Sequence, residues 1–221
     1  MRVPRCCFAV LRGEPSRFAG RSQQGDEAMA RGLYVPAYDG EPLEMRDFEG
    51  DAIGTAVGGL MEAVDIPALG ITVYVNEEGL LRRLPFNSRV SFAWWYYVPE
   101  ARRSMLVGDA VIVGEPDIDG ADTDIPESTL EMFINPRQWG ILIDPGGMPA
   151  SGVMPDTMLN HVLLPLVAGR PQKVVSTACY ASCFDAMAWA LSLGERWPEM
   201  DDFAILPMSQ VLEHFGVTPS E

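Results

Sequence analysis

Histidine and lysine are scarce in this sequence of 221 residues. The imidazoles are His161 and His214, and the single lysine is Lys173. A histidine-based catalytic or metal site would have to use one of these two histidines, and each lies in a segment predicted to be helical, where packing or exposure is its expected role. The phosphate-binding loop, the His-Glu-x-x-His zinc pattern and the Gly-x-Ser-x-Gly nucleophile elbow are also missing. We therefore predict no metal, no cofactor and no catalytic residue.

Positive charge is scarce as well. Sixteen basic residues stand against 31 acidic ones, for a formal net charge of −15. Such a surface repels the phosphates of duplex DNA and of anionic membranes. No apolar run reaches the roughly 20 residues that cross a bilayer, because Asp185 interrupts the most hydrophobic helix candidate. Four cysteines without a recognised export signal indicate reduced thiols and a cytoplasmic protein.

Three regions of the chain differ in their pattern. Residues 1–28 are polar and lack periodicity, which predicts a disordered or non-native leader, with Met29 as an alternative start. Residues 29–127 predict an α+β domain with a small mixed or antiparallel sheet and one helix. Residues 128–221 predict a mainly helical C-terminal region packed on that domain.

The N-terminal domain is expected to open with a hairpin, because Asp39-Gly40 suits a tight turn between strands at 33–36 and 43–45. A helix capped by Asp51 should continue through Met61. The β-branched and aromatic residues predict three further strands, at 71–75, 90–98 and 105–113.

In the C-terminal region, one strand is predicted at 139–143. Helices are predicted at 156–166, from Ser176 or Thr177 to Leu193, and at 209–215. The long middle helix carries one charge between residues 178 and 193, which predicts burial on most sides.

Four segments of the N-terminal domain carry a resemblance to a known family. They are Gly58-Gly59-Leu60-Met61-Glu62-Ala63-Val64, Val73-Tyr74-Val75-Asn76-Glu77-Glu78-Gly79, Leu84-Pro85-Phe86-Asn87 and Val107-Gly108-Asp109-Ala110-Val111-Ile112-Val113-Gly114. In this order and spacing, residues 31–125 resemble the bacterial and phage family known as domain of unknown function 3846. That family has no established activity, so the resemblance implies an association with actinobacteria, their phages and mobile elements, and no mechanism.

Asn76 belongs to the most characteristic of these segments. Its amide both donates and accepts hydrogen bonds and could contact a ligand at the end of a strand. The alternative is an Asx-type turn closed by Gly79, which we favour because Asn and Gly are ordinary turn residues.

Cys179 and Cys183 are four residues apart in the predicted long helix, so their thiols should share one face. Together with the two histidines they could supply four zinc ligands. Their spacing matches no zinc motif, and we expect small core residues instead.

An acidic segment without any basic residue connects the two regions. Its acids are Glu115, Asp117, Asp119, Asp122, Asp124 and Glu127. The order of a calcium-binding EF-hand loop is broken, because Ala121 takes a ligand position. We expect a solvated acidic loop, which could also help to mimic the phosphate spacing of DNA.

The strongest functional signal is a segment, 82–103, in which arginines surround aromatic residues. The arginines are Arg82, Arg83, Arg89, Arg102 and Arg103, and the aromatics are Phe86, Phe92, Trp94, Trp95, Tyr96 and Tyr97. In a strand, Trp95 and Tyr97 would share one face, which could meet the C-terminal region, a protein partner or a flat ligand. Burial of both faces beneath helices is the favoured alternative.

We therefore expect an accessory protein of a phage or mobile element that binds a host protein, with DNA mimicry or inhibition of a defence factor as a specific version. A binder of small ligands or nucleotides that uses Asn76, Trp95, Tyr97 and the nearby arginines is the alternative. An enzyme of unrecognised class is the third possibility.

Overall fold

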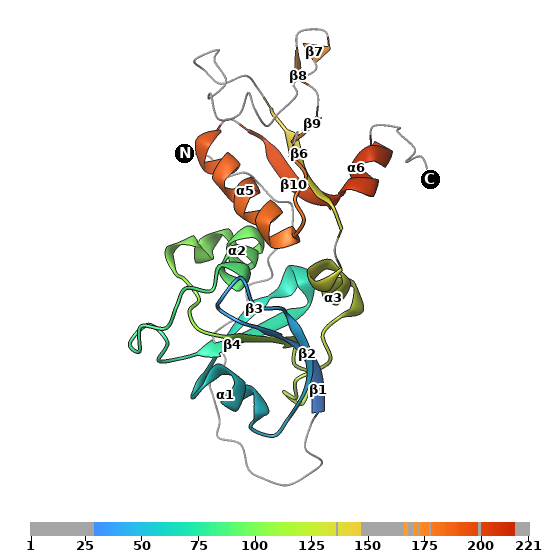
Figure 1. The fold of residues 1–221 in the computed structure, drawn as a ribbon. Helices are drawn as coiled ribbons and strands as arrows, with labels where there is room; N and C mark the ends of the chain where they lie inside the picture. The colour runs from blue at the N-terminus through green and yellow to red at the C-terminus, as the bar shows by residue number, and fades with distance from the viewer. Residues whose placement is uncertain are drawn as a thin grey trace.

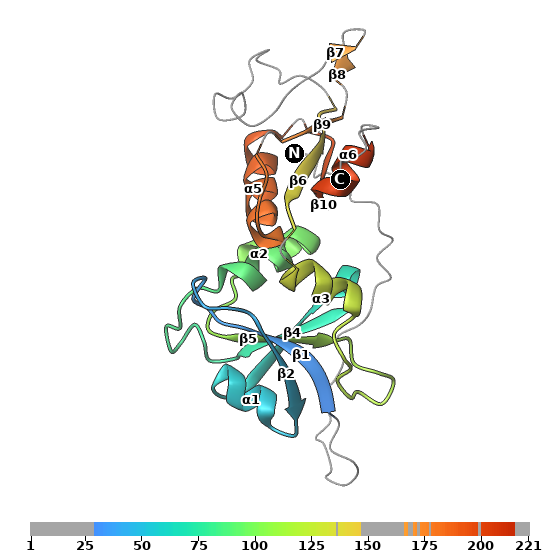
Figure 2. The same cartoon turned by 45° about the vertical axis from the view of Figure 1, so that its right-hand side comes forward.

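The fold is described from a computed structural model (Figure 1). The structure describes residues 29–135, 137–146, 166–167, 170–171, 173–176, 178–198 and 200–214. A five-stranded sheet forms the N-terminal domain, and a smaller sheet flanked by helices forms a C-terminal unit above it (Figures 1 and 2).

The five-stranded sheet is antiparallel throughout, in the order β2-β1-β5-β4-β3. Its strands are β1 (Met29–Val35), β2 (Glu44–Glu49), β3 (Met61–Ile66), β4 (Ile71–Asn76) and β5 (Ala110–Gly114). The side chains alternate between two faces, as the pleat requires. One face, with Val111 and Val113, packs on α1 (Ala52–Val57), and the other, with Leu33 and Ile112, packs on α2 (Ser88–Tyr97) and α3 (Glu127–Ile134).

The predicted N-terminal hairpin is confirmed, since β1 and β2 pair and the Glu41 amide donates to the Tyr38 carbonyl across the turn. The predicted strand at 71–75 is confirmed as β4. The predicted strand at 105–113 is shorter, because β5 begins only at Ala110. Strand β3, which pairs with β4 across a 3-10 turn, was not predicted.

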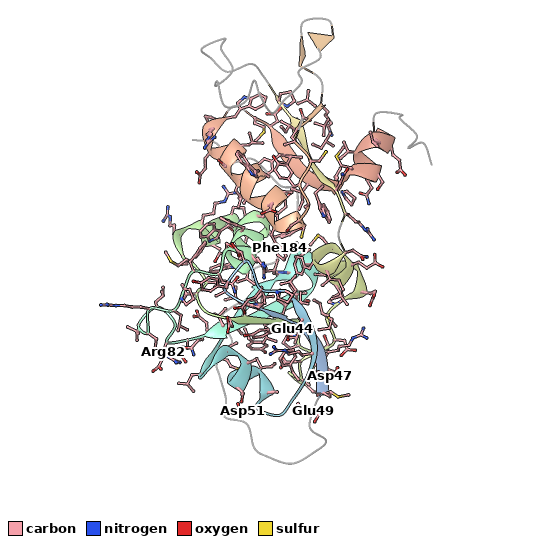
Figure 3. All side chains as sticks on the ribbon, in the orientation of Figure 1. Glu44, Asp47, Glu49, Asp51, Arg82 and Phe184 are labelled. Carbon is pink, nitrogen blue, oxygen red and sulfur yellow. The ribbon has the colours of Figure 1, made fainter. Side chains whose placement is uncertain are left out.

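Acidic side chains mark the outer strand β2. Glu44, Asp47 and Glu49 are exposed along it, and Asp51 follows at the start of α1 (Figure 3). Charged side chains on an edge strand disfavour pairing with the edge of another sheet. Helix α1 is also shorter than predicted, because Gly58 ends it in the left-handed conformation (φ +78°) and Met61 belongs to β3. Asp51 makes no side-chain capping hydrogen bond there.

The prediction of a strand at 90–98 is wrong, because residues 88–97 form the helix α2. Asn87 caps this helix, with its side-chain oxygen accepting from the Val90 amide. The helix is followed by a 3-10 turn, η2 (Pro99–Arg103). As a result, aromatic residues that would alternate along a strand are distributed around a helix.

The prediction of a mainly helical C-terminal region is not supported by the described residues. Besides most of α3, they contain a three-stranded sheet of order β10-β6-β9, a two-stranded pair and two further helices. These elements are β6 (Trp139–Asp144), β7 (Leu166–Val167), β8 (Arg170–Pro171), β9 (Val174–Val175), α5 (Cys183–Arg196), β10 (Asp202–Pro207) and α6 (Met208–His214). The predicted strand at 139–143 and the final helix are confirmed, whereas β9 and β10 were not predicted.

Helix α5 begins later than the sequence predicts. Its cap is Ser182, whose hydroxyl accepts from the Phe184 amide, and Ser176 lies in the sheet region instead. The predicted burial of this helix is confirmed over most of its length. The helix predicted at 156–166 falls almost entirely outside the described residues.

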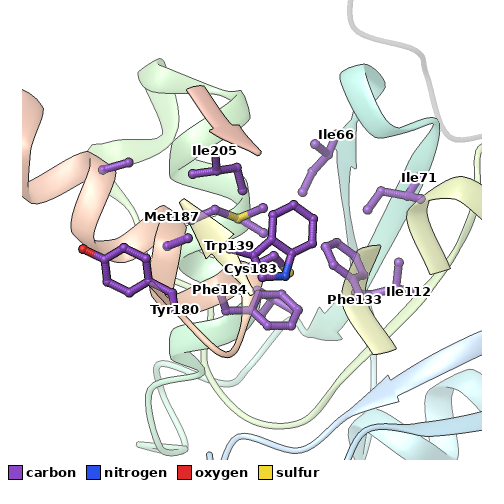
Figure 4. Packing of buried hydrophobic residues seen from close by; sticks show 14 of the residues in the cluster. Ile66, Ile71, Ile112, Phe133, Trp139, Tyr180, Cys183, Phe184, Met187 and Ile205 are labelled. Atoms are coloured by element: carbon purple, nitrogen blue, oxygen red, sulfur yellow. The ribbon is translucent and has the colours of Figure 1, made fainter. Parts of the chain in front are cut away.

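A continuous apolar core joins the two parts of the molecule. Phe133 of α3 stacks on Phe184 of α5 with ring centroids 4.9 Å apart (Figure 4). Tyr96 of α2 packs on Phe203, and its hydroxyl accepts a hydrogen bond from the Ile205 amide at 3.0 Å. Helix α2 therefore connects the N-terminal sheet to the C-terminal unit. In the described residues, no helix has the length and apolar character needed to span a bilayer.

Candidate functional site

Asn76 lies at the end of β4 and is 3% exposed. Its Nδ2 donates to the Val57 carbonyl at 3.1 Å, and its Oδ1 accepts from the Glu78 amide at 2.9 Å. The second bond closes the Asx-type turn that the sequence favoured. Both polar ends of the amide are therefore engaged by backbone groups of the chain itself.

Arg82 binds the same helix end. Its Nη1 donates to the Gly58 carbonyl at 2.7 Å, next to the carbonyl that Asn76 contacts. The C-terminal carbonyls of a helix carry partial negative charge and lack partners within the helix, so an arginine stabilises them. Together the two side chains fasten the loop that follows β4 to the end of α1.

The glycines of this region are explained by the same contacts. A Cβ at Gly59 would lie 2.9 Å from Asn76 Nδ2, and a Cβ at Gly79 would lie 2.7 Å from a methyl group of Val107. Neither position has room for a side chain. The segments that carry the family resemblance therefore meet at one point of the fold, which includes the end of α1, the end of β4 and the loop after it.

The loop after β4, which Asn76 and Arg82 fasten to the end of α1, exposes apolar side chains. Leu80 is 64% exposed and Leu81 is 85% exposed. Arg83 follows with φ +57°, a left-handed conformation that costs roughly 1 kcal/mol for a residue other than glycine. Within the described residues it is the only non-glycine residue with a positive φ.

A cluster of three aromatic rings lies beside this loop. Trp95 stacks on Phe86 at 5.9 Å and meets Phe92 edge-on at 5.6 Å. The indole N–H of Trp95 donates to the Ser104 carbonyl at 2.8 Å, and Arg102 Nε donates to the Trp95 carbonyl at 3.3 Å. The cluster thus connects the loop, through Phe86, to the turn η2.

We refer to the exposed residues around this cluster as the arginine surface. Its members are Leu80, Leu81, Arg82, Arg83, Phe86, Arg102, Arg103 and Met105. The segment between β4 and α2 and the segment after α2 lie on the same side of the molecule in both views of the ribbon (Figures 1 and 2). Among the described residues, none of its four arginines forms an ion pair with a carboxylate.

The structure does not bring all the predicted site residues together. The side chain of Arg89 is 15% exposed and contacts Asp39, through both its carboxylate and its backbone carbonyl. Tyr97 points toward α3, where its hydroxyl contacts the sulfur of Met132, and burial raises the pKa of this phenol. Trp95 and Tyr97 therefore lie on different sides of α2, contrary to the shared face that a strand would give.

Three of the six acids of the acidic loop, Asp122, Asp124 and Glu127, contact strands of the sheet. Asp122 accepts from the Tyr74 hydroxyl at 2.6 Å, and Asp124 accepts from the Arg31 amide at 2.7 Å. Asp117 accepts from the amides of residues 119 and 121 within its own turn. Glu127 pairs with Arg31 at 3.6 Å, and Glu115 and Asp119 are exposed. No group of metal-ligating side chains is assembled in the part of the chain that the structure describes.

The expectation that Cys179 and Cys183 share a helical face is wrong, because α5 begins only at Cys183. Cys179 is exposed, whereas Cys183 is 1% exposed, and burial raises the pKa of its thiol to about 12. His161 and the side chain of His214 lie outside the described part of the structure. The expected role of a small core residue is therefore confirmed for Cys183 and wrong for Cys179.

Sequence reasoning missed the aliphatic members of the arginine surface. Leu80, Leu81 and Met105 were not considered as candidates, although two consecutive leucines directly after the turn predicted at residues 76–79 are an available signal. Apolar residues in a turn have no strand or helix face to bury them. Their exposure could have been inferred from that position.

The N-terminal domain is similar to a known family. Residues 33–136 match the model of the family described as "Domain of unknown function (DUF3846)", which confirms the resemblance seen in the sequence. A search of curated proteins gave no match. A solved structure described as "Crystal structure of small RNA methyltransferase HEN1" aligns with a TM-score of 0.33 at 13% identity, covering 75% of this chain and 29% of that chain. A similarity this low supports no functional argument.

Proposed function

We propose that this protein acts by binding another protein through the arginine surface. One observation carries the proposal: four exposed arginines without ion pairs surround four exposed apolar side chains, at 85%, 64%, 50% and 39% exposure. Arginine and large apolar side chains are enriched at protein interfaces, where a few of them supply most of the binding energy. A loop fixed by Asn76 and Arg82 loses little conformational freedom on binding.

The finer proposal is that the protein is an accessory factor of a phage or mobile element and that its target is a host protein in the cytoplasm. Support for a phage or mobile element comes from the family resemblance, which implies an association with actinobacteria, their phages and mobile elements. In a DNA-mimic version, the target would contact the acidic loop instead of the arginine surface. The nucleotide-binding alternative needs Trp95 and Tyr97 on one surface, and no described contact favours it.

Arg83 and Arg103 are the best residues for a test, because no intramolecular hydrogen bond or ion pair of their side chains is found in the described structure. The full chain, an R83E/R103E variant and a charge-preserving R83K/R103K variant would be immobilised and exposed to lysate of the host bacterium. A K173E/R196E variant is the matched control, since it makes the same change of charge at two exposed positions of the C-terminal unit.

We expect quantitative mass spectrometry to find proteins that three of these forms retain and that R83E/R103E loses by about tenfold or more, which corresponds to about 1.4 kcal/mol. Equal retention by all four forms would refute the proposal. Retention that survives R83E/R103E but is lost with E115Q/D119N would support the DNA-mimic version in its place.

A further inference from the structure

We infer that the arginine surface receives a short acidic segment of the partner protein, one in which carboxylates alternate with apolar side chains. This inference rests on the proposed function and names the chemistry of the partner. It is carried by the charge, the apolar exposure and the fixed geometry of the surface.

The charges of the chain leave this surface unpaired. Elsewhere in the described structure, Arg31, Arg46, Arg89 and Arg137 each lie within ion-pair distance of a carboxylate. The four arginines of the arginine surface have no such partner among the described residues, although the chain has 31 acidic residues. A guanidinium group binds a carboxylate with two parallel hydrogen bonds, so carboxylates are suitable partners for these groups.

The acids closest in sequence do not supply those partners. Glu77 and Glu78 precede the loop, and Glu100 lies in η2, and all three are exposed. None of them forms an ion pair with an arginine in the described part of the chain. The guanidinium groups of Arg83 and Arg103 therefore remain available to a second molecule. Those of Arg82 and Arg102 each use one N–H group for a backbone carbonyl and keep the others.

The apolar members of the surface favour a protein segment over a nucleic acid. Three of the four exposed apolar side chains, those of Leu80, Leu81 and Met105, offer no ring on which a base could stack, whereas single-stranded nucleic acids bind largely by stacking on aromatic rings. The indole of Trp95 is already packed against Phe86 and Phe92. The net charge of −15 also repels a polyphosphate more strongly than a segment with a few carboxylates.

The shape of the surface is fixed before binding. Asn76 and Arg82 hold one end of the loop, and Phe86 holds the other end through its contacts with Phe92 and Trp95. Arg83 adopts its left-handed conformation between these two anchors. A surface ordered in this way can bind a short segment without a large loss of its own entropy.

The probe is a fluorescent peptide of about 18 residues, in which leucines and glutamates alternate along the sequence. Its binding to the full chain would be measured by fluorescence anisotropy, together with a peptide in which lysine replaces every glutamate and a labelled single-stranded oligothymidine. We expect the acidic peptide to bind at the arginine surface. Any binding of the lysine peptide to this protein of net charge −15 should not be weakened by R83E/R103E.

The variants locate the binding. R83E/R103E should weaken it by about tenfold or more, and R83K/R103K should weaken it less, because lysine keeps the charge but cannot form the paired hydrogen bonds. K173E/R196E, at exposed positions of the C-terminal unit, should change it by less than about threefold. Replacement of the exposed leucines, L80S/L81S, should weaken binding at high salt as well as at low salt, because that contribution is not screened.

Absence of binding by the acidic peptide, or binding of that peptide that R83E/R103E leaves unchanged, would overturn the inference. Tighter binding of the oligothymidine would indicate a nucleic-acid surface. If R83E/R103E abolishes the retention of host proteins while the acidic peptide does not bind to the unsubstituted chain, the inference fails and the proposed function stands. If R83E/R103E changes neither the retention of host proteins nor the binding of the acidic peptide, the inference and the proposed function both fail.

Discussion

Replacement of Asn76 by alanine should destabilise the protein strongly. The substitution leaves the Val57 carbonyl and the Glu78 amide without their side-chain partners, at a position that is 3% exposed. Each lost hydrogen bond costs about 1 kcal/mol, and a buried group left unsatisfied costs about 1–3 kcal/mol. We therefore expect the free energy of unfolding to fall by about 2–4 kcal/mol.

Asn76→Asp separates the two hydrogen bonds. The carboxylate can still accept from the Glu78 amide, but it would face the Val57 carbonyl at the position where the amide nitrogen donates. The charged form is disfavoured there, so the pKa of the new carboxyl should be raised in the folded state. The variant should then lose stability as pH rises above about 4, where an aspartate in the unfolded chain ionises.

Urea unfolding followed by tryptophan fluorescence provides the measurement, because the midpoint and slope together give the free energy of unfolding. Asn135→Ala is the matched control, since this exposed residue ends α3 and its described hydrogen bond uses only its backbone amide. It should change stability by less than about 0.5 kcal/mol. A similarly small effect of Asn76→Ala would refute the structural role of the amide and return Asn76 to the candidate ligand contacts.

Three further substitutions or treatments test other parts of the structure. Arg83→Gly should raise the free energy of unfolding by about 0.5–1 kcal/mol in the same urea assay, because glycine adopts the left-handed conformation without strain; a loss of stability would contradict the conformation described here. Iodoacetamide at pH 8 should label Cys179 and spare Cys183 until urea unfolds the chain, as peptide mass spectrometry would show. Because burial raises the pKa of the Cys183 thiol to about 12, its contribution to stability should decline as pH rises above the ordinary value of 9.0. Tyr96→Phe should lower the free energy of unfolding by about 1 kcal/mol by removing the acceptor for the Ile205 amide, and an unchanged midpoint would argue against that bond.

The sheet of the N-terminal domain was largely predictable, and the helix α2 was not. Strand β4 follows from its run of β-branched residues, and the first hairpin follows from Asp39-Gly40. The aromatic residues of α2 have high intrinsic β propensity, but tertiary packing overrides that preference. Asn87 before Ser88 was the available signal of a helix start, and the apolar spacing of Val90 and Ala93 agrees with it.

The candidate site was also predictable only in part. The sequence correctly located the Asx turn of Asn76 and the concentration of arginines, because both depend on residues close together in the chain. It could not separate Arg89 and Tyr97 from the other candidates, since their partners Asp39 and Met132 are distant in sequence. The C-terminal sheet was missed for a related reason: β10 pairs with β6 across more than 50 intervening residues.

The apolar junction between the two parts of the molecule has a consequence for other proteins that contain this domain. The family match ends at residue 136, yet Tyr97, Met132 and Phe133 within it pack against or next to the C-terminal unit. A protein that consisted of this domain alone would place those side chains in water. We expect such proteins to carry polar residues at the equivalent positions, or to cover them with another subunit. Whether the residues at these three positions are polar or apolar would then indicate, from sequence alone, whether another unit packs on the domain.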